Sequence, residues 1–155
     1  MTKRRVPRGK AGPPSLELGQ QLCFALYSAS RAMTKVYRRL LDPLGLTYPQ
    51  YLVMLVLWER DGLTVTEVGE RLYLDSATLT PLLKRLQAAG LVTRTRASTD
   101  ERQLLVALTS AGRRLKVTAA GLPESILRAA DCQMADLTAI QARLESLRAT
   151  LFENA

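Results

Sequence analysis

The middle of the chain constrains the fold most, because short helical and strand-like segments follow one another there in a fixed order. Thr64 and Glu67 have capping-box spacing, which predicts the start of a short helix. Asp75 is a favoured residue to begin the next helix, and Gly90 is a favoured residue to end it. Two strand-like runs then flank a polar turn, at 91–96 and 102–108. This order predicts a winged helix-turn-helix.

The second of these helices has an apolar face and a polar face. At ~100° per residue, one arc holds Leu79, Leu82, Leu83 and Leu86. Since Pro81 lacks a backbone N–H, we expect the regular helix to begin near Ala77 or Thr78. Small and hydroxyl side chains followed one turn later by cations suit a helix that enters the major groove of DNA. The candidate contacts are Ser76, Thr78, Thr80, Pro81, Lys84 and Arg85. The alternative is an ordinary solvated helix face.

The predicted hairpin also carries cations. Arg94 and Arg96 are two residues apart on one strand, so they share a face. Asp100 and Arg102 flank the turn, where an arginine can enter the minor groove and a carboxylate can hold its guanidinium. The alternative is a surface ion pair worth ~0–1 kcal/mol. The excess of basic residues from 84 to 116 favours an acidic partner, and nucleic acid is the commonest one.

Composition excludes several other classes of function. The chain has 22 Lys and Arg against 14 Asp and Glu, a net charge of +8, and no histidine. Histidine-dependent catalysis and histidine metal sites are therefore excluded, and no cofactor is implied. We expect a cytoplasmic protein with reduced thiols, because we find no signal peptide and no apolar run of membrane-spanning length. The basic segment 1–14 is expected to be disordered.

Helical patterns flank the winged segment on both sides. Apolar residues recur at helical spacing over 16–44, and Pro43 and Gly45 mark the end of this helix. Thr47 and Gln50 have capping-box spacing, which predicts the start of the very apolar helix that follows. Thr109 is expected to cap another helix, which is interrupted or restarted near 121–123, and a last helix covers about 134–152.

The segment LYLDSATLTPLLKRLQAAGLVTRTRASTDERQLLVALTSAG resembles the winged helix of the MarR family of bacterial regulators. The D-x-R pattern in the wing and the L-T-x-x-G after it are typical of that family. The resemblance implies a mainly α fold whose only sheet is a small β-wing. It also implies a homodimer through interleaved N- and C-terminal helices that binds an inverted repeat in double-stranded operator DNA. We therefore expect one domain over 15–155, with the winged helix at about 46–108 and dimerisation helices at about 15–45 and 109–155.

The segment QLCFALYSASRAMTKVYRRLLDPLGLTYPQYLVMLVLWE resembles the organic hydroperoxide regulator branch of that family. The resemblance implies a repressor that loses operator affinity when an organic hydroperoxide oxidises a cysteine near the start of the first helix. That residue is Cys23. Three tyrosines accompany the cysteine in the family, and they match Tyr27, Tyr37 and Tyr48.

The spacing of these residues has a physical meaning. Tyr27 lies one helical turn from Cys23, so it can contact that thiol within one chain. Tyr37 lies ~21 Å further along a straight helix, so it cannot touch Cys23 of its own chain, but it could reach the cysteine of a partner whose helix runs antiparallel. Phenol O–H groups that donate to sulfur favour the thiolate, which is the form that attacks peroxide. If the helix begins near Ser15, the helix dipole contributes little at Cys23. The alternative is that Cys23 is a core residue.

The role of Cys132 stays open at this point. The resemblance implies a resolving cysteine near the end of the fifth helix, but the family pattern would place it about one turn earlier, near Arg128. Resolution by Cys132, a mixed disulfide with a small thiol, and overoxidation of Cys23 are three alternatives. For the whole protein the alternatives are a repressor released by a phenolic ligand, a thiol peroxidase, and a helical interaction protein that never binds DNA. We expect a regulator and not an enzyme.

Overall fold

A computed structural model of the chain describes residues 16–96 and 103–155. The chain divides into two compact units, Met1–Lys35 and Val36–Ala155, with the boundary inside the first long helix. The basic tail, Asp100 and Arg102 lie outside the described residues, so what we expect of them stays a prediction. The domain boundaries also stay a prediction.

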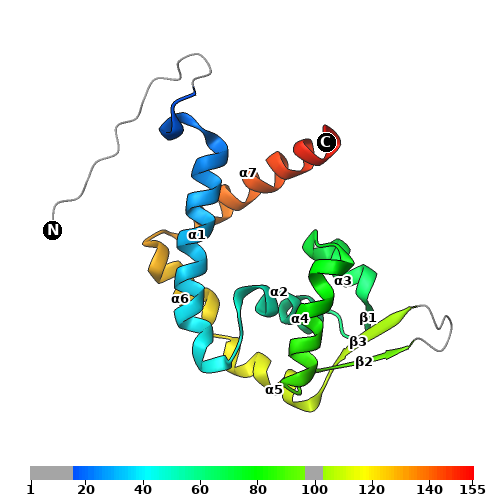
Figure 1. The fold of residues 1–155 in the computed structure, drawn as a ribbon. Helices are drawn as coiled ribbons and strands as arrows, with labels where there is room; N and C mark the ends of the chain where they lie inside the picture. Colours follow the sequence, from blue (N-terminus) through cyan, green and yellow to red (C-terminus); the bar gives the residue numbers. More distant parts are fainter. Residues whose placement is uncertain (1–15, 97–102) are drawn as a thin grey trace. The chain divides into compact units, whose positions relative to one another are not determined.

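Helices dominate the described residues, and a small sheet joins them (Figure 1). This confirms the predicted mainly α fold with a β-wing. In chain order, with η for a 3-10 helix, the elements are η1 (Leu18–Gln20), α1 (Leu22–Leu41), η2 (Asp42–Leu44), α2 (Tyr48–Glu59), β1 (Leu63–Thr64), α3 (Val65–Leu72), α4 (Ser76–Ala88), β2 (Val92–Arg96), β3 (Leu104–Leu108), α5 (Ser110–Ala119), α6 (Leu122–Ala130) and α7 (Met134–Glu153).

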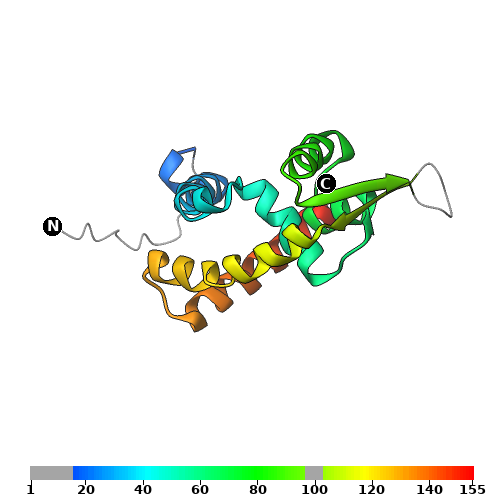
Figure 2. The ribbon, with the colours of Figure 1, turned by 90° about the horizontal axis from the view of Figure 1, so that it is seen from below.

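The sheet is antiparallel, with the strand order β1-β3-β2. Val92 pairs with Leu108 at the base of the hairpin, and Arg96 pairs with Leu104 at its far end. The ends of β2 and β3 extend beyond α3 and α4 in two perpendicular views (Figures 1 and 2). The third strand was not predicted, because two residues are too few to show an alternating pattern. Its Leu63 is buried and pairs with Val106.

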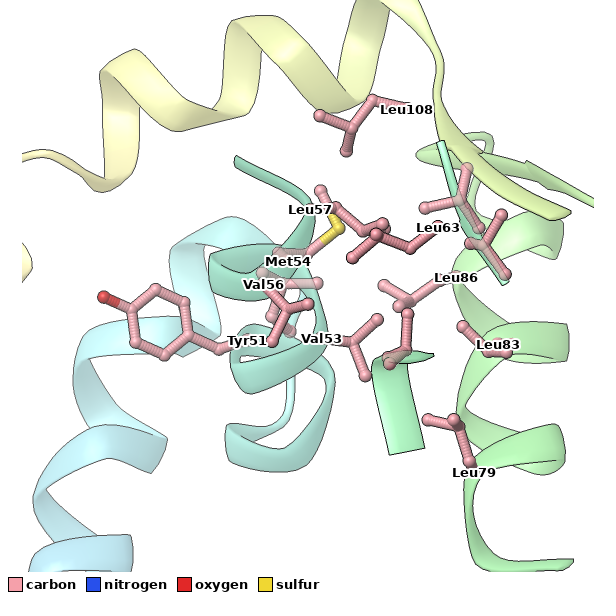
Figure 3. Packing of buried hydrophobic residues seen from close by; sticks show 14 of the residues in the cluster. Tyr51, Val53, Met54, Val56, Leu57, Leu63, Leu79, Leu83, Leu86 and Leu108 are labelled. Atoms are coloured by element: carbon pink, nitrogen blue, oxygen red, sulfur yellow. The ribbon is translucent and has the colours of Figure 1, made fainter. Parts of the chain in front are cut away.

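The core of the larger unit lies between α2, α4 and the sheet. The helix α2 is buried on most sides, as its uninterrupted apolar sequence predicts. Figure 3 shows its Met54 and Leu57 beside Leu63 and the leucines of α4. Leu79, Leu83 and Leu86 are fully buried and Leu82 is half-buried, which confirms the predicted apolar arc. The core therefore fixes which face of α4 turns toward solvent.

Two helix starts differ from the prediction. The α4 helix begins at Ser76, one or two residues earlier than expected, and Pro81 lies inside it. Asp75 makes this start possible, because its carboxylate accepts a hydrogen bond of 2.6 Å from the backbone N–H of Thr78. The α1 helix begins at Leu22, after the short 3-10 turn η1, and not near residue 16. The other predicted caps, at Thr47, Thr64 and Thr109, are all present.

The C-terminal half forms three helices. The predicted interruption near 121–123 is confirmed, since α5 ends at Ala119 and α6 begins at Leu122. Asp61, just after α2, accepts a hydrogen bond of 2.8 Å from the backbone N–H of Leu108 and pairs with Arg113 at 2.8 Å. This carboxylate joins the end of α2, the wing and α5. Within residues 16–96 and 103–155, no single helix has the length and apolar content to cross a membrane, although one bent pair, Leu22–Leu44 with Tyr48–Glu59, passes on length and composition alone.

Candidate DNA interface and sulfur site

The polar face of α4 is open to solvent, as the sequence predicts. Ser76 and Thr78 lie in its first turn, and Pro81, Lys84 and Arg85 follow on exposed positions. Thr80 differs, because it is half-buried and its hydroxyl donates to the backbone carbonyl of Ser76 at 2.6 Å. The hydroxyl proton of Thr80 is therefore already engaged within α4.

The wing is tied to α4 through one of its predicted cations. The Nε of Arg94 donates a hydrogen bond of 2.6 Å to the side-chain oxygen of Gln87. Arg94 is half-buried, whereas Arg96 at the end of β2 is exposed. The sequence did not predict the contact with Gln87, because the pair is brought together only when the hairpin folds back on α4. Arg94 therefore orients the wing, and Arg96 is the described wing cation that faces solvent.

Cys23 is exposed and is the second residue of α1. The expectation about the helix dipole assumed a helix start near Ser15, and this condition is not met, because α1 begins at Leu22. The first turn of a helix carries backbone N–H groups without intrahelical acceptors, and the positive end of the macrodipole lies there. Cys23 therefore lies in the first turn of α1, beside these groups.

Tyr27 lies one turn after Cys23 on α1 and is exposed. Arg31, a further turn along, donates a hydrogen bond of 2.9 Å to its phenol oxygen, and its guanidinium lies 5.5 Å from the ring centroid. Because the phenol oxygen is used as the acceptor, the single phenol proton stays available as a donor. The sequence analysis missed Arg31, although its i+4 spacing from Tyr27 was a usable signal.

The other two predicted tyrosines meet in the larger unit. The ring centroids of Tyr37 and Tyr48 are 4.4 Å apart, and Tyr51 adds a third ring 5.8 Å from Tyr37. Burial, with smaller contributions from Tyr48 and Tyr51, raises the pKa of Tyr37 to about 12. Burial also raises the pKa of Tyr48 and of Tyr51. All three phenols therefore keep their protons near neutral pH and can act as donors.

Tyr51 was not singled out by the sequence analysis, although it lies three residues after Tyr48 on the same helix. Its side chain is almost fully buried, and its ring lies edge-on to Trp58 at 6.1 Å. Figure 3 shows its hydroxyl pointing away from the aliphatic side chains of the core. The ring of Tyr51 therefore supports the Tyr37–Tyr48 pair from the side of the core.

Cys132 lies between α6 and α7 and is half-buried. Its sulfur lies 3.2 Å from the backbone carbonyl oxygen of Ala130, in hydrogen-bond contact. The helix before it, α6, ends at Ala130, so Cys132 lies two residues beyond the end of that helix. Arg128, where the family pattern places the resolving residue, lies in the last turn of α6 and pairs with Glu124 at 3.5 Å.

The fold and the solvent-facing cations of α4 define a winged helix-turn-helix protein of the kind that binds DNA. The family model of the transcriptional regulator SarA/Rot matches residues 35–118. The organic hydroperoxide resistance transcriptional regulator of Bacillus subtilis is 49% identical over 138 residues, which cover 89% of this chain and 94% of that protein. This chain belongs to the MarR-type family of winged-helix transcriptional regulators, in the branch of the organic hydroperoxide resistance regulators.

Solved structures of similar proteins also indicate a DNA-binding winged helix. Reduced AbfR of Staphylococcus epidermidis bound to DNA superposes with a TM-score of 0.75 and 37% identity, covering 88% of this chain and 93% of that one. Overoxidized AbfR bound to DNA gives a TM-score of 0.72 and 38% identity, covering 86% and 94%. The winged helix of this chain is thus similar to winged helices that have been solved on DNA.

Proposed function

We propose that this chain is a homodimeric repressor that binds an inverted repeat in operator DNA and leaves it when an organic hydroperoxide oxidises Cys23. The observation that carries the DNA part is the exposed basic face of α4 above a buried leucine arc. In a dimer, two such helices would enter successive major grooves. Such a regulator works in the cytoplasm, where its DNA is.

Exposed apolar side chains support the proposed dimer. On α7, Ile140 is 51% exposed and Leu144 is 42% exposed, and Leu22 and Phe24 of α1 are also exposed. Large apolar side chains in this number on two terminal helices favour burial against a second copy of the chain. The proposed dimer would bring Tyr37 and Tyr48 of one subunit to the thiol of the other.

The proposed reaction is a two-electron oxidation of sulfur. The Cys23 thiolate attacks one oxygen of the hydroperoxide, the O–O bond breaks, and the organic alkoxide leaves with a proton as the alcohol. The product is a sulfenic acid, which condenses with a second thiol to a disulfide and releases water. Loss of the phenol hydrogen bonds to the thiolate would then change the packing of the dimerisation helices. A coupling of ~1–3 kcal/mol would lower operator affinity about 5- to 150-fold.

A sensor of this kind differs from a thiol peroxidase in turnover. The relatives are transcriptional regulators, and we propose that this chain likewise reacts about once per oxidation cycle. With dithiothreitol and excess cumene hydroperoxide, peroxide consumption should be slow, without the many rapid turnovers of an enzyme. Continuous rapid turnover would favour the peroxidase instead. Release by a non-oxidising phenolic ligand predicts that Cys23→Ser remains fully inducible.

We propose Cys132 as the thiol that resolves oxidised Cys23. After one equivalent of cumene hydroperoxide, intact-mass spectrometry without reductant should show two chains joined covalently in the wild type. Cys132→Ser should show single chains that carry one added oxygen on Cys23, because the sulfenic acid then lacks its partner thiol. Cys23→Ser should show neither product.

Adding a small thiol such as cysteine to oxidised Cys132→Ser distinguishes the alternatives. A mixed disulfide on Cys23 is expected there, and it should be scarce in the wild type if Cys132 reacts first. Covalent dimers that persist in Cys132→Ser would show that Cys132 is not the resolving residue.

A further inference from the structure

The turn between α3 and α4 holds a tyrosine in an unusual backbone conformation. Tyr73 has φ of 56°, in the left-handed region that bulky residues rarely adopt. The turn around it is tight, because a Cβ on Gly69 would lie 2.7 Å from the backbone oxygen of Leu74. The backbone N–H of Leu74 in turn donates to the carbonyl of Gly69 at 2.9 Å. Tyr73 therefore has one well-defined position, two residues before the cap of α4.

The side chain of Tyr73 is 55% exposed and contacts the last turns of α7, which belongs to the same compact unit. Its ring stacks on Phe152, with centroids 5.2 Å apart and planes at 19°. The guanidinium of Arg148 lies 4.5 Å from the centroid of the Tyr73 ring. Stacking and cation–π contacts of this geometry are both attractive. Arg148 and Phe152 are one helical turn apart on the same face of α7, so both side chains can contact Tyr73.

We propose that Arg148 and Phe152 are positioning residues that hold Tyr73, and through it the start of α4, in the orientation that fits the major groove. We call these three side chains the α7 clamp. The clamp acts on DNA binding indirectly, through Asp75 and the first turn of α4, which begin two residues after Tyr73. The inference rests on the proposed function, because it assigns a role in operator binding.

The surroundings of the clamp allow the turn to shift when the contact is lost. A cleft of about 550 Å³ lies beside it, lined by Glu70, Leu74 and Ser76 together with Tyr73 and Phe152. Because α7 is also a proposed dimerisation helix, a shift of its last turns after oxidation would reach α4 through Tyr73. The clamp would thus join the dimer interface to the DNA-binding helix within one chain.

The test is operator binding by Phe152→Ala, which removes the stacked ring without changing charge. Fluorescence anisotropy would compare the operator duplex with a scrambled duplex of the same length at one salt concentration. We expect operator affinity to fall about three- to tenfold, the range that such an aromatic pair supplies. Affinity for the scrambled duplex should stay unchanged, because backbone contacts do not require an oriented α4. Phe152→Tyr should restore operator affinity, since it restores the ring.

A second pair of variants tests Arg148 against a control that loses the same charge. Arg148→Ala and Arg143→Ala each remove one cation from α7, and Arg143 is exposed. Only Arg148→Ala should lower the ratio of operator to scrambled affinity, while size-exclusion chromatography and thermal melting show folded dimers. The clamp is overturned if Phe152→Ala binds the operator like wild type, or if it weakens both duplexes equally. If the wild type itself shows no preference for the operator, the proposed function fails first and the clamp with it.

Discussion

Replacing Lys84 and Arg85 together by glutamine is expected to lower operator affinity about 100-fold. Both side chains are exposed on the polar face of α4, one turn after its small N-terminal residues. A cation that reads a base edge contributes ~1–3 kcal/mol, and a cation on phosphate adds to this through counterion release. Fluorescence anisotropy at several salt concentrations would give the affinity and its salt dependence.

The slope of log affinity against log salt should fall by about one for each phosphate contact removed. A matched control is Lys35→Gln with Arg143→Gln, which removes the same charge from exposed positions outside α4. If the control double variant loses as much affinity as the α4 variant, then net charge accounts for binding and α4 is not the recognition helix.

Gly112→Ala is expected to destabilise the fold by about 4 kcal/mol or more. A Cβ there would lie 2.1 Å from the backbone oxygen of Leu91 and 3.2 Å from Cδ2 of Leu108, so the backbone of the wing base would have to move. The same residue is held by Trp58, whose Nε1 donates 2.9 Å to the Gly112 carbonyl. Differential scanning calorimetry should show a midpoint about 10 °C or more below wild type.

Gly121→Ala is the matched control for this substitution. Gly121 has an ordinary φ of −84°, and a Cβ there meets no atom within 4 Å. Its stability should stay within about 0.5 kcal/mol of wild type. Equal midpoints for the two alanine variants would show that α5 does not pack closely on the wing base.

Much of the fold could be predicted from the sequence because the local signals agreed. The capping residues Thr47, Thr64 and Thr109 stand where the structure has helix starts, and the leucines of α4 recur at the helical period. Where prediction was wrong, two signals competed. Pro81 argued for a late start of α4, but the Asp75 cap fixes the earlier one. At the first helix, apolar spacing continued upstream through η1 and hid the start at Leu22.

The candidate site was predicted less completely, because its contacts join residues whose spacing carries little information. Tyr37 and Tyr48 are on different helices, and only the family resemblance linked them. Arg94 contacts Gln87 only after the hairpin folds. Phe152 and Tyr73 are far apart in the sequence and come into contact only in the folded unit. Tyr51 and Arg31 are different, since their spacing from Tyr48 and Tyr27 was visible in the sequence. A search of every i+3 and i+4 neighbour of the tyrosines would have found both.

The pKa of Tyr37 also could not be read from the sequence. Its rise to about 12 follows first from burial and then from the two neighbouring phenols, all of which depend on tertiary packing. The consequence for function is that this phenol remains a hydrogen-bond donor throughout the pH range in which a cysteine is oxidised.

Oxidation of Cys23 is expected to lower operator affinity. The most direct measurement is fluorescence anisotropy of an inverted-repeat duplex at fixed salt, before and after one equivalent of cumene hydroperoxide and again after dithiothreitol. The peroxide is kept stoichiometric to limit overoxidation of the sulfur. The overoxidized form of the relative AbfR has been solved on DNA. We predict that wild type loses affinity 5- to 150-fold and regains it with dithiothreitol, while Cys23→Ser binds equally throughout. Unchanged binding of both proteins, or equal loss in both, would show that oxidation of Cys23 does not control operator binding.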